Sequence, residues 1–173
     1  MRIRSQENGG ELEIRVASRN DYDAYNRLIM EVDTLHAAEA PRYFQLPDPP
    51  GRDADYFASF LNDPSQIVFL AEVDGRVVGQ IHLELQQPGD LPILVKRRVV
   101  RVTDIGVTPS HQRKGVGHAL LDQAKAWSRA QGAEELSLSV YAFNHPAASL
   151  YEAEGFRVVR SVMALPLDKP GAS

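Results

Sequence analysis

The chain of 173 residues is long enough for one well-filled hydrophobic core and short for two, so a single domain is expected. An apolar fraction of 43% and a charged fraction of 24% are ordinary for a globular protein, which excludes a disordered, collagen-like or disulfide-stapled chain. The absence of cysteine excludes thiolate metal sites and a cysteine nucleophile. A formal net charge of −4 argues against a nucleic-acid-binding surface, so no nucleic-acid partner is expected.

The N-terminal stretch holds two arginines but no apolar signal region, and no segment approaches the roughly 18 apolar residues of a membrane span. A cytoplasmic location without a membrane partner is therefore expected. The domain is predicted at residues 11–167, between flexible tails at residues 1–10 and 168–173. The basic run at residues 96–98, with Arg101, is interpreted as a solvated loop and strand entrance.

The first half of the chain predicts a strand, two helices and a hairpin. A strand is expected at residues 12–16, then a helix from about Asn20 to His36 with apolar residues at helical spacing, then a proline-rich loop at residues 40–50. Asp53 opens a short helix whose inward side chains are predicted as Tyr56, Phe57, Phe60 and Leu61. Asp74-Gly75, between strands at residues 66–73 and 76–86, predicts a two-residue type I′ hairpin.

The second half changes to alternating strands and helices. A loop at residues 87–98 leads to a strand at residues 99–107, followed by a helix at residues 115–130 that Gly132 ends. A strand with alternating apolar residues is expected at residues 136–140, then a helix at residues 146–154 capped by Asn144 or His145. A last strand is predicted at residues 156–165.

The loop before the helix at residues 115–130 has the features of an anion site. Glycines at 115 and 117 let the backbone approach a ligand, and the first amides of a helix lack internal partners. Arg113 and Lys114 would add charge. A Walker loop is excluded because it needs a Lys-Ser or Lys-Thr pair directly after its last glycine, where this chain has Val116-Gly117-His118. A dinucleotide site is disfavoured because the preceding strands form a hairpin.

Two linked segments carry a resemblance to a known family. Val107-Thr108-Pro109 followed by Gln112 to Gly117 resembles the acetyl-CoA loop of the GNAT N-acetyltransferases, and residues 144–156 resemble that family's Asn-x-x-Ala-x-x-Leu-Tyr-x-x-x-Gly-Phe segment. The resemblance covers residues 11–167. It implies an α/β fold of the α+β type: a mixed, mostly antiparallel sheet of about six or seven strands and about four helices, with a V-shaped splay between the central parallel strands.

The resemblance also implies a cofactor and a site. Acetyl-CoA would enter the splay and pair with exposed backbone, Asn144 would position it, and Tyr151 would protonate the thiolate leaving group, a role that the phenol's ordinary pKa near 10 makes reasonable. The alternative for Tyr151 is a core tyrosine. The expected cofactor-binding residues are Ile105, Gly106, Val107, Gln112, Arg113, Lys114, Gly115, Val116, Gly117, His118, Ala119, Asn144, Ala148 and Tyr151.

The base that would deprotonate the amine is less obvious. Some family members carry a glutamate twelve residues before the tyrosine, where this chain has Ser139. Asp104, a carboxylate in an apolar strand, is the candidate base, and its alternative is an ion pair with Arg101 or Arg98. Glu84, His36 and Tyr43 are candidates for substrate binding, with ordinary surface roles as the alternative. No metal spacing is found among the histidines, and His111 and His118 flank the loop without a carboxylate partner at metal-ligand distance in the sequence, so no metal is expected.

The function predicted on this basis is transfer of an acetyl group from acetyl-CoA to a primary amine, of a small molecule or a peptide, by direct attack in a ternary complex. The alternative is a catalytically inactive acyl-CoA-binding regulatory module, which the serine at position 139 makes reasonable. A homodimer is a further expectation. Acceptor choice is assigned to the loops at residues 35–51 and 87–98.

Overall fold

The computed structural model describes residues 3–7, 10–48, 51–87, 89 and 92–167. Its centre is a six-stranded sheet in the order β1-β2-β3-β4-β5-β6. All neighbouring strands are antiparallel except β5 and β6, which are parallel. The strands are β1 (Ile3–Glu7), β2 (Gly10–Val16), β3 (Gln66–Val73), β4 (Arg76–Gln86), β5 (Val99–Val107) and β6 (Glu135–Ser137). The mixed, mostly antiparallel sheet predicted from the sequence is confirmed.

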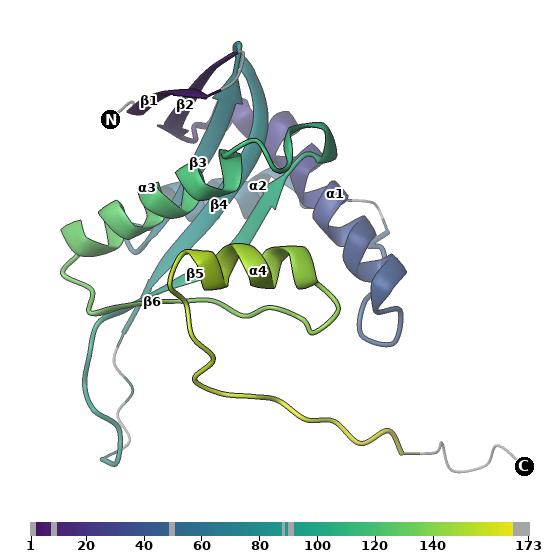
Figure 1. Ribbon diagram of the computed structural model, residues 1–173, viewed down its shortest axis with the longest axis vertical. Coiled ribbons are helices and arrows are strands. Elements are labelled where there is room, and N and C mark those ends of the chain that lie inside the picture. The colour runs from purple at the N-terminus through teal and green to yellow at the C-terminus, as the bar shows by residue number, and fades with distance from the viewer. Residues whose placement is uncertain (1–2, 8–9, 49–50, 88, 90–91, 168–173) are drawn as a thin grey trace, which may run out of the picture.

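Helices cover both faces of this sheet (Figure 1). On one face α1 (Tyr22–Glu39) and α2 (Ala54–Asn62) build a core with aromatic members such as Tyr25, Phe57 and Phe60. On the other face α3 (Val116–Ala130) and α4 (His145–Ala153) cover a larger core that includes Leu120, Leu121 and Tyr151. Short 3₁₀ turns, η1 (Arg19–Asp21) and η2 (Pro109–His111), precede α1 and follow β5.

Local signals explain the elements whose predicted bounds match. Asp74 and Gly75 have φ angles of 50° and 76°, as a type I′ hairpin requires, and β3 and β4 flank them as expected. The Asp53 side chain accepts a hydrogen bond of 2.6 Å from the Tyr56 backbone N–H and so caps α2. Gly132, at φ 67°, follows the end of α3.

Other expectations were wrong. Tyr56 is half exposed on α2 instead of inward, whereas the helix predicted at about residues 20–36 is present as α1, from Tyr22 to Glu39. β1 lies within the first ten residues, predicted as a tail, because it pairs with β2. β6 ends at Ser137 and not at residue 140, and residues 156–165 form no strand. The predicted tail at residues 168–173 lies outside the described residues.

Candidate functional site

The splay at the end of β5 is the structural centre of the candidate site. β5 pairs with β4 along its length but with β6 only from Val99 to Arg101, opposite residues 135–137. From Val102 onward, the edge of β5 that faces β6 has no strand partner among the described residues. The backbone of three predicted cofactor-binding residues, Ile105, Gly106 and Val107, lies along this stretch. Backbone groups that need partners can therefore meet an extended ligand here.

The side chains of this stretch point to opposite faces of the sheet. Ile105 and Val107 pack against the core beneath α3, whereas Gly106 lies beneath α1. A Cβ atom at position 106 would lie 2.8 Å from Val32 Cγ2, closer than real carbon contacts allow. Glycine at this position therefore lets α1 pack directly on the strand that borders the splay.

The loop between η2 and α3 has the backbone shape of an anion site. Arg113 and Gly115 both lie in the left-handed region, with φ angles of 59° and 80°, and Gly115 is the residue from which α3 begins. Left-handed residues within a turn direct successive N–H groups into one concavity, and the first amides of α3 add unpartnered donors and the positive end of the helix dipole. The residues fit a pyrophosphate group.

Some side chains of this loop hold it in place, and others are free to contact a bound anion. The Gln112 Nε2 group donates a hydrogen bond of 2.9 Å to the Val107 carbonyl and so ties the loop to the end of β5. Arg113 and Lys114 are exposed and can meet an anion directly. The Val116 side chain is buried in the core, so this residue can contribute only its backbone N–H to a ligand.

Helix α4 is fixed to α3 beside the loop. A Cβ atom at Gly117 would lie 2.9 Å from the Leu150 side chain, so glycine permits close packing of the two helices. His118 of α3 pairs with the Glu154 carboxylate, which also binds Lys125. His118 therefore has a carboxylate partner from α4, and these contacts give it and Gly117 structural roles.

The N-terminus of α4 carries two more of the predicted residues. Asn144 caps the helix, since its Oδ1 accepts a hydrogen bond of 3.2 Å from the Ala147 backbone N–H. Ala148 is partly buried in the first turns, and its N–H donates to the Asn144 carbonyl. Ala119, in α3, is partly buried and packs against the core.

Tyr151 lies on the inner side of α4, with 8% of its surface exposed. Its ring contacts Phe156 edge-on at a centroid distance of 5.9 Å. Burial, and secondarily the charge of Asp104, raises the pKa of Tyr151 to about 12. The phenol is therefore fully protonated at neutral pH, and the two predicted catalytic residues are near enough for one to influence the ionisation of the other.

Asp104 faces α1 at an irregularity of the sheet. It lies opposite His82, and one extra residue of β5, Thr103, interrupts the register there. Burial first, and then the negative charge of Asp33 on α1, raises the pKa of Asp104 to about 6, although Gln80, Arg52 and His36 oppose this rise. No ion pair joins Asp104 to Arg101 or Arg98 in the described ranges, so the predicted structural alternative is not supported.

Gln80 is a site residue that the sequence did not reveal. Its side chain is fully buried on β4, opposite Gly106. Its amide lies close enough to Asp104 to lower that pKa, although neither polar atom completes a hydrogen bond of ordinary geometry within the protein. A buried amide of this kind is costly unless it meets a partner. Its position in the alternating pattern of β4 gave no signal of this role.

An aromatic cluster surrounds His36, and we define it as His36, Tyr43, Phe44, Tyr141 and Phe143. The His36 ring lies 4.9 Å from Phe44, 5.9 Å from Tyr141 and 5.5 Å from Phe143, while Tyr43 lies 6.3 Å from Tyr141. The cluster joins the loop after α1 to the loop before α4. His36 and Tyr43, predicted to bind substrate, are thus brought together.

Glu84 is not part of this group. It lies on β4 opposite Gln66 and Arg101, beyond His82, and no contact found among the described residues connects it to Asp104. Phe44, Tyr141 and Phe143 were missed because they come from two distant loops. The only sequence signal for Tyr141 and Phe143 is the Tyr-x-Phe run just before Asn144.

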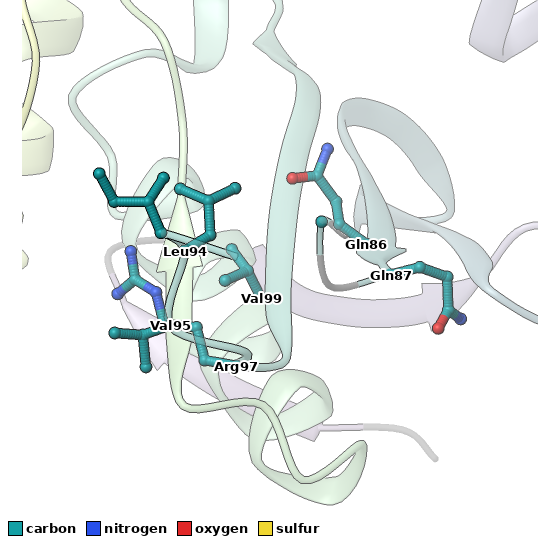
Figure 2. A pocket seen from close by; sticks show the side chains of 8 residues that line it. Gln86, Gln87, Leu94, Val95, Arg97 and Val99 are labelled. Atoms are coloured by element: carbon teal, nitrogen blue, oxygen red, sulfur yellow. The ribbon is translucent and has the colours of Figure 1, made fainter. Parts of the chain in front are cut away.

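One hollow of the surface lies away from these residues. Figure 2 shows a cavity of about 520 Å³ between the end of β4 and the start of β5, lined by Gln86, Gln87, Leu94, Val95, Arg97 and Val99 among others. It lies at the opposite end of β5 from the loop at residues 112–115. We therefore place the candidate site by its backbone geometry and its perturbed carboxyl, and not by this cavity.

Two further observations concern membranes and metals. None of the described helices combines the length and apolar character that crossing a bilayer requires. In the described ranges, no three histidine, cysteine, aspartate or glutamate side chains gather as a metal site would require.

Comparison with known proteins agrees with this geometry. The model described as the acetyltransferase (GNAT) family matches residues 32–156. An N-alpha-acetyltransferase of Sulfurisphaera tokodaii is 32% identical over 165 residues, which cover 92% of this chain and 89% of that protein.

Solved structures extend the comparison at the level of the fold alone. A mutant of the Bacillus halodurans protein BH1408 has a TM-score of 0.85 at 24% identity, covering 89% of this chain and 98% of that one. The aminoglycoside N-acetyltransferase AAC(6′)-Iy, in complex with CoA, has a TM-score of 0.70 at 19% identity, covering 92% and 97%. With a splayed sheet, a loop that has the backbone shape of an anion site and a family match over well more than half its length, the chain belongs to the acetyltransferase (GNAT) family.

Proposed function

We propose that this protein transfers an acetyl group from acetyl-CoA to the α-amino group at the N-terminus of a peptide or protein. The observation that carries the proposal is the splay of β5 next to the loop at residues 112–115, together with the buried Tyr151, whose pKa the charge of Asp104 helps to raise. A phenol that stays protonated and a carboxyl with a raised pKa are the acid and base that amide formation from a thioester needs.

The cofactor would be held mainly by backbone. The amides of the loop from Arg113 to Val116 would bind the pyrophosphate, and the unpartnered edge at residues 105–107 would pair with the pantetheine arm. Bound acetyl-CoA supplies a thioester whose acyl carbon an amine can attack. A cytoplasmic location remains a prediction.

Asp104 would accept the proton that the amine loses when its nitrogen bonds to the acyl carbon. With a pKa of about 6, the carboxyl is mostly ionised at pH 7 to 8 and yet more basic than an ordinary aspartate. As the carbon–sulfur bond breaks, the Tyr151 hydroxyl would donate its proton to the thiolate. The sum of these steps is an N-acetyl amine and free CoA.

The pKa of the acceptor amine favours an α-amino group over a lysine as the substrate. At pH 7.5 an α-amino group with a pKa near 8 is neutral in roughly a quarter of molecules, whereas a lysine with a pKa near 10.4 is neutral in about 0.1%. At this pH, deprotonating the lysine costs about 4 kcal/mol, whereas deprotonating the α-amino group costs about 0.7 kcal/mol, so less is asked of the base. The N-alpha-acetyltransferase similarity supports the same acceptor class. The aromatic cluster, beside Asp104 through His36, would contact the first side chain of the peptide.

The first experiment is calorimetric titration with acetyl-CoA, followed by a free-thiol assay with two matched peptides. One peptide carries a free N-terminus and an acetylated lysine, and the other an acetylated N-terminus and a free lysine. Because the protein has no cysteine, all thiol released comes from CoA. Release with the first peptide alone is expected. Release with the second alone would contradict the acceptor class, binding without release would favour the inactive acyl-CoA-binding module, and no binding would overturn both.

The variant Tyr151→Phe separates the enzyme from the binding module. Loss of the proton donor should lower kcat by about 10² or more while the affinity for acetyl-CoA stays within about twofold. Tyr56→Phe, on the exposed side of α2, is the control and should change neither quantity. An unchanged kcat in Tyr151→Phe would remove this residue from the mechanism.

A further inference from the structure

The C-terminal segment, residues 157–165, leaves the body of the protein in extended form. Figure 1 shows it running away from α4 and the sheet toward the C-terminus. Its large apolar side chains are almost fully exposed: Val158 84%, Val159 86%, Val162 87%, Met163 95% and Leu165 82%. A contiguous apolar surface of this kind marks a binding surface in a soluble protein.

The composition of the segment is that of a buried strand. Valines at 158, 159 and 162 favour extended backbone, and apolar residues occupy both alternating faces, which is typical of a strand covered on both sides. The segment contains no glycine, proline, asparagine or aspartate between Arg157 and Leu165 that would favour a tight reversal. It therefore needs a sheet edge that it can reach without turning back.

The sheet offers such an edge at β6. β6 is the last strand in the order and pairs only with β5 within the described part of the chain. Beyond it, Val140 is 41% exposed. Arg97 pairs with Glu135 at the start of β6. An open edge beside apolar surface is a template for an added strand.

The start of the segment sets its direction. Gly155, at φ 91°, follows α4, and the Phe156 N–H donates a hydrogen bond of 3.0 Å to the Tyr151 carbonyl. The Phe156 ring also contacts Tyr151. The chain is therefore anchored to α4 as it departs, and this departure leads away from its own β6 (Figure 1).

We propose that residues 157–165 of one copy add as a strand to β6 of a second copy, and that the second copy returns its own segment in the same way. Each chain carries both the donated strand and the accepting edge, so the exchange closes with two copies and leaves neither segment exposed. This inference goes beyond the proposed reaction and does not depend on it.

The first test measures the mass of the full chain by light scattering and sedimentation over a range of concentrations. A dimer is expected. Val162→Pro removes a backbone donor from the middle of the segment and should raise the dimer dissociation constant by about tenfold or more, whereas Val162→Thr keeps the donor and should change it little. Since Val162 is 87% exposed in the single chain, neither substitution disturbs the fold of the monomer. A monomeric full chain, or a Val162→Pro dimer as tight as the parent, would overturn the proposal.

The second test distinguishes exchange from a segment that folds back on its own chain. The parent has no cysteine, so the double variant Val140→Cys with Val162→Cys carries only the two introduced thiols. After treatment with a short bifunctional maleimide at low protein concentration, denaturing electrophoresis should give a covalent dimer. The two single variants are the controls for random collision. A double variant crosslinked within one chain, and migrating as a monomer, would contradict the exchange.

Discussion

Burial of the Asp104 carboxyl beneath α1 raises its pKa to about 6, in the range that suits the proposed base. Because only the ionised form accepts a proton, kcat with a peptide acceptor should fall as the pH drops through about 6. Asp104→Asn should lower kcat by about 10² to 10⁴ and abolish this acidic limb. The check is the pH dependence of kcat at saturating substrate, which reports groups in the bound complex and not the free amine. An acidic limb that persists in the variant would assign it to another group.

The same residue should also reveal itself through stability. A carboxyl whose pKa is higher in the folded than in the unfolded protein opposes folding once it is ionised, so this cost appears as the pH rises from about 4 to about 6. Asp104→Asn should therefore increase the free energy of unfolding at pH 7 by about 1 to 3 kcal/mol, and the gain should vanish near pH 4. Urea unfolding at both pH values measures it. A variant that is less stable at pH 7 would show that the carboxylate is a structural partner.

Arg113 combines a strained backbone with a cationic side chain. Its φ of 59° is costly for a residue with a Cβ atom. Arg113→Gly should raise the free energy of unfolding by about 1 kcal/mol, because the strain is removed, while acetyl-CoA binding weakens because the charge is lost. Arg113→Lys keeps both the charge and the strain, and it should bind the cofactor nearly as well without added stability. Equal cofactor affinity in all three proteins would exclude a phosphate contact for this side chain.

At the scale of elements, the contact of α3 with α4 joins the anion-binding loop to the helix that bears Tyr151. Gly117→Val should push on Leu150, shift α4 and lower both cofactor affinity and kcat. Gly117→Val with Leu150→Ala restores the space and should recover part of both. A double-mutant cycle in calorimetry and turnover measures this coupling. Losses that simply add would show that Gly117 acts through the ligand alone.

The elements also show where the sequence was a sufficient guide. The bounds of β3, β4 and β5 follow from local features, such as Asp74-Gly75 and Pro109, and they match the structure. β6 and the C-terminal segment were mispredicted because a strand exists only where a partner edge is present. Their alternating residues predict an extended backbone that can pair, but they do not predict which strand edge is available to pair with it.

The candidate site divides in the same way. The loop at residues 112–117 and Tyr151 lie in short contiguous motifs, and Asp104 was noticeable as a carboxyl in an apolar strand. Gln80 and Tyr141 could not be found, because their roles arise when separate strands and loops meet. The predicted ion pair of Asp104 with Arg101 failed for a related reason, since Arg101 faces Glu84 across the sheet instead.

At the scale of the whole molecule, the free energy of the proposed exchange comes from the exposed apolar segment. Each Val, Leu or Met side chain buried between two copies contributes about 1.5 to 3 kcal/mol, before the cost of ordering the segment is subtracted. Because folding is then linked to association, the thermal midpoint should rise by several degrees for each tenfold increase in protein concentration. Differential scanning fluorimetry measures this shift, and Val162→Pro should show it only at protein concentrations about tenfold higher or more. A midpoint independent of concentration in the parent would argue that the chain acts alone.

The edge-on contact of Phe156 with Tyr151 places the root of the donated strand against the proposed proton donor. Pairing of that strand with a second copy would therefore also restrict the motion of the Tyr151 ring, and an unpaired strand would leave the ring more mobile. The kcat per chain would then depend on the protein concentration, because dilution would raise the fraction of monomers and monomers would turn over more slowly. The amount of protein made would therefore change the total activity in two ways, through the number of chains and through the kcat of each chain.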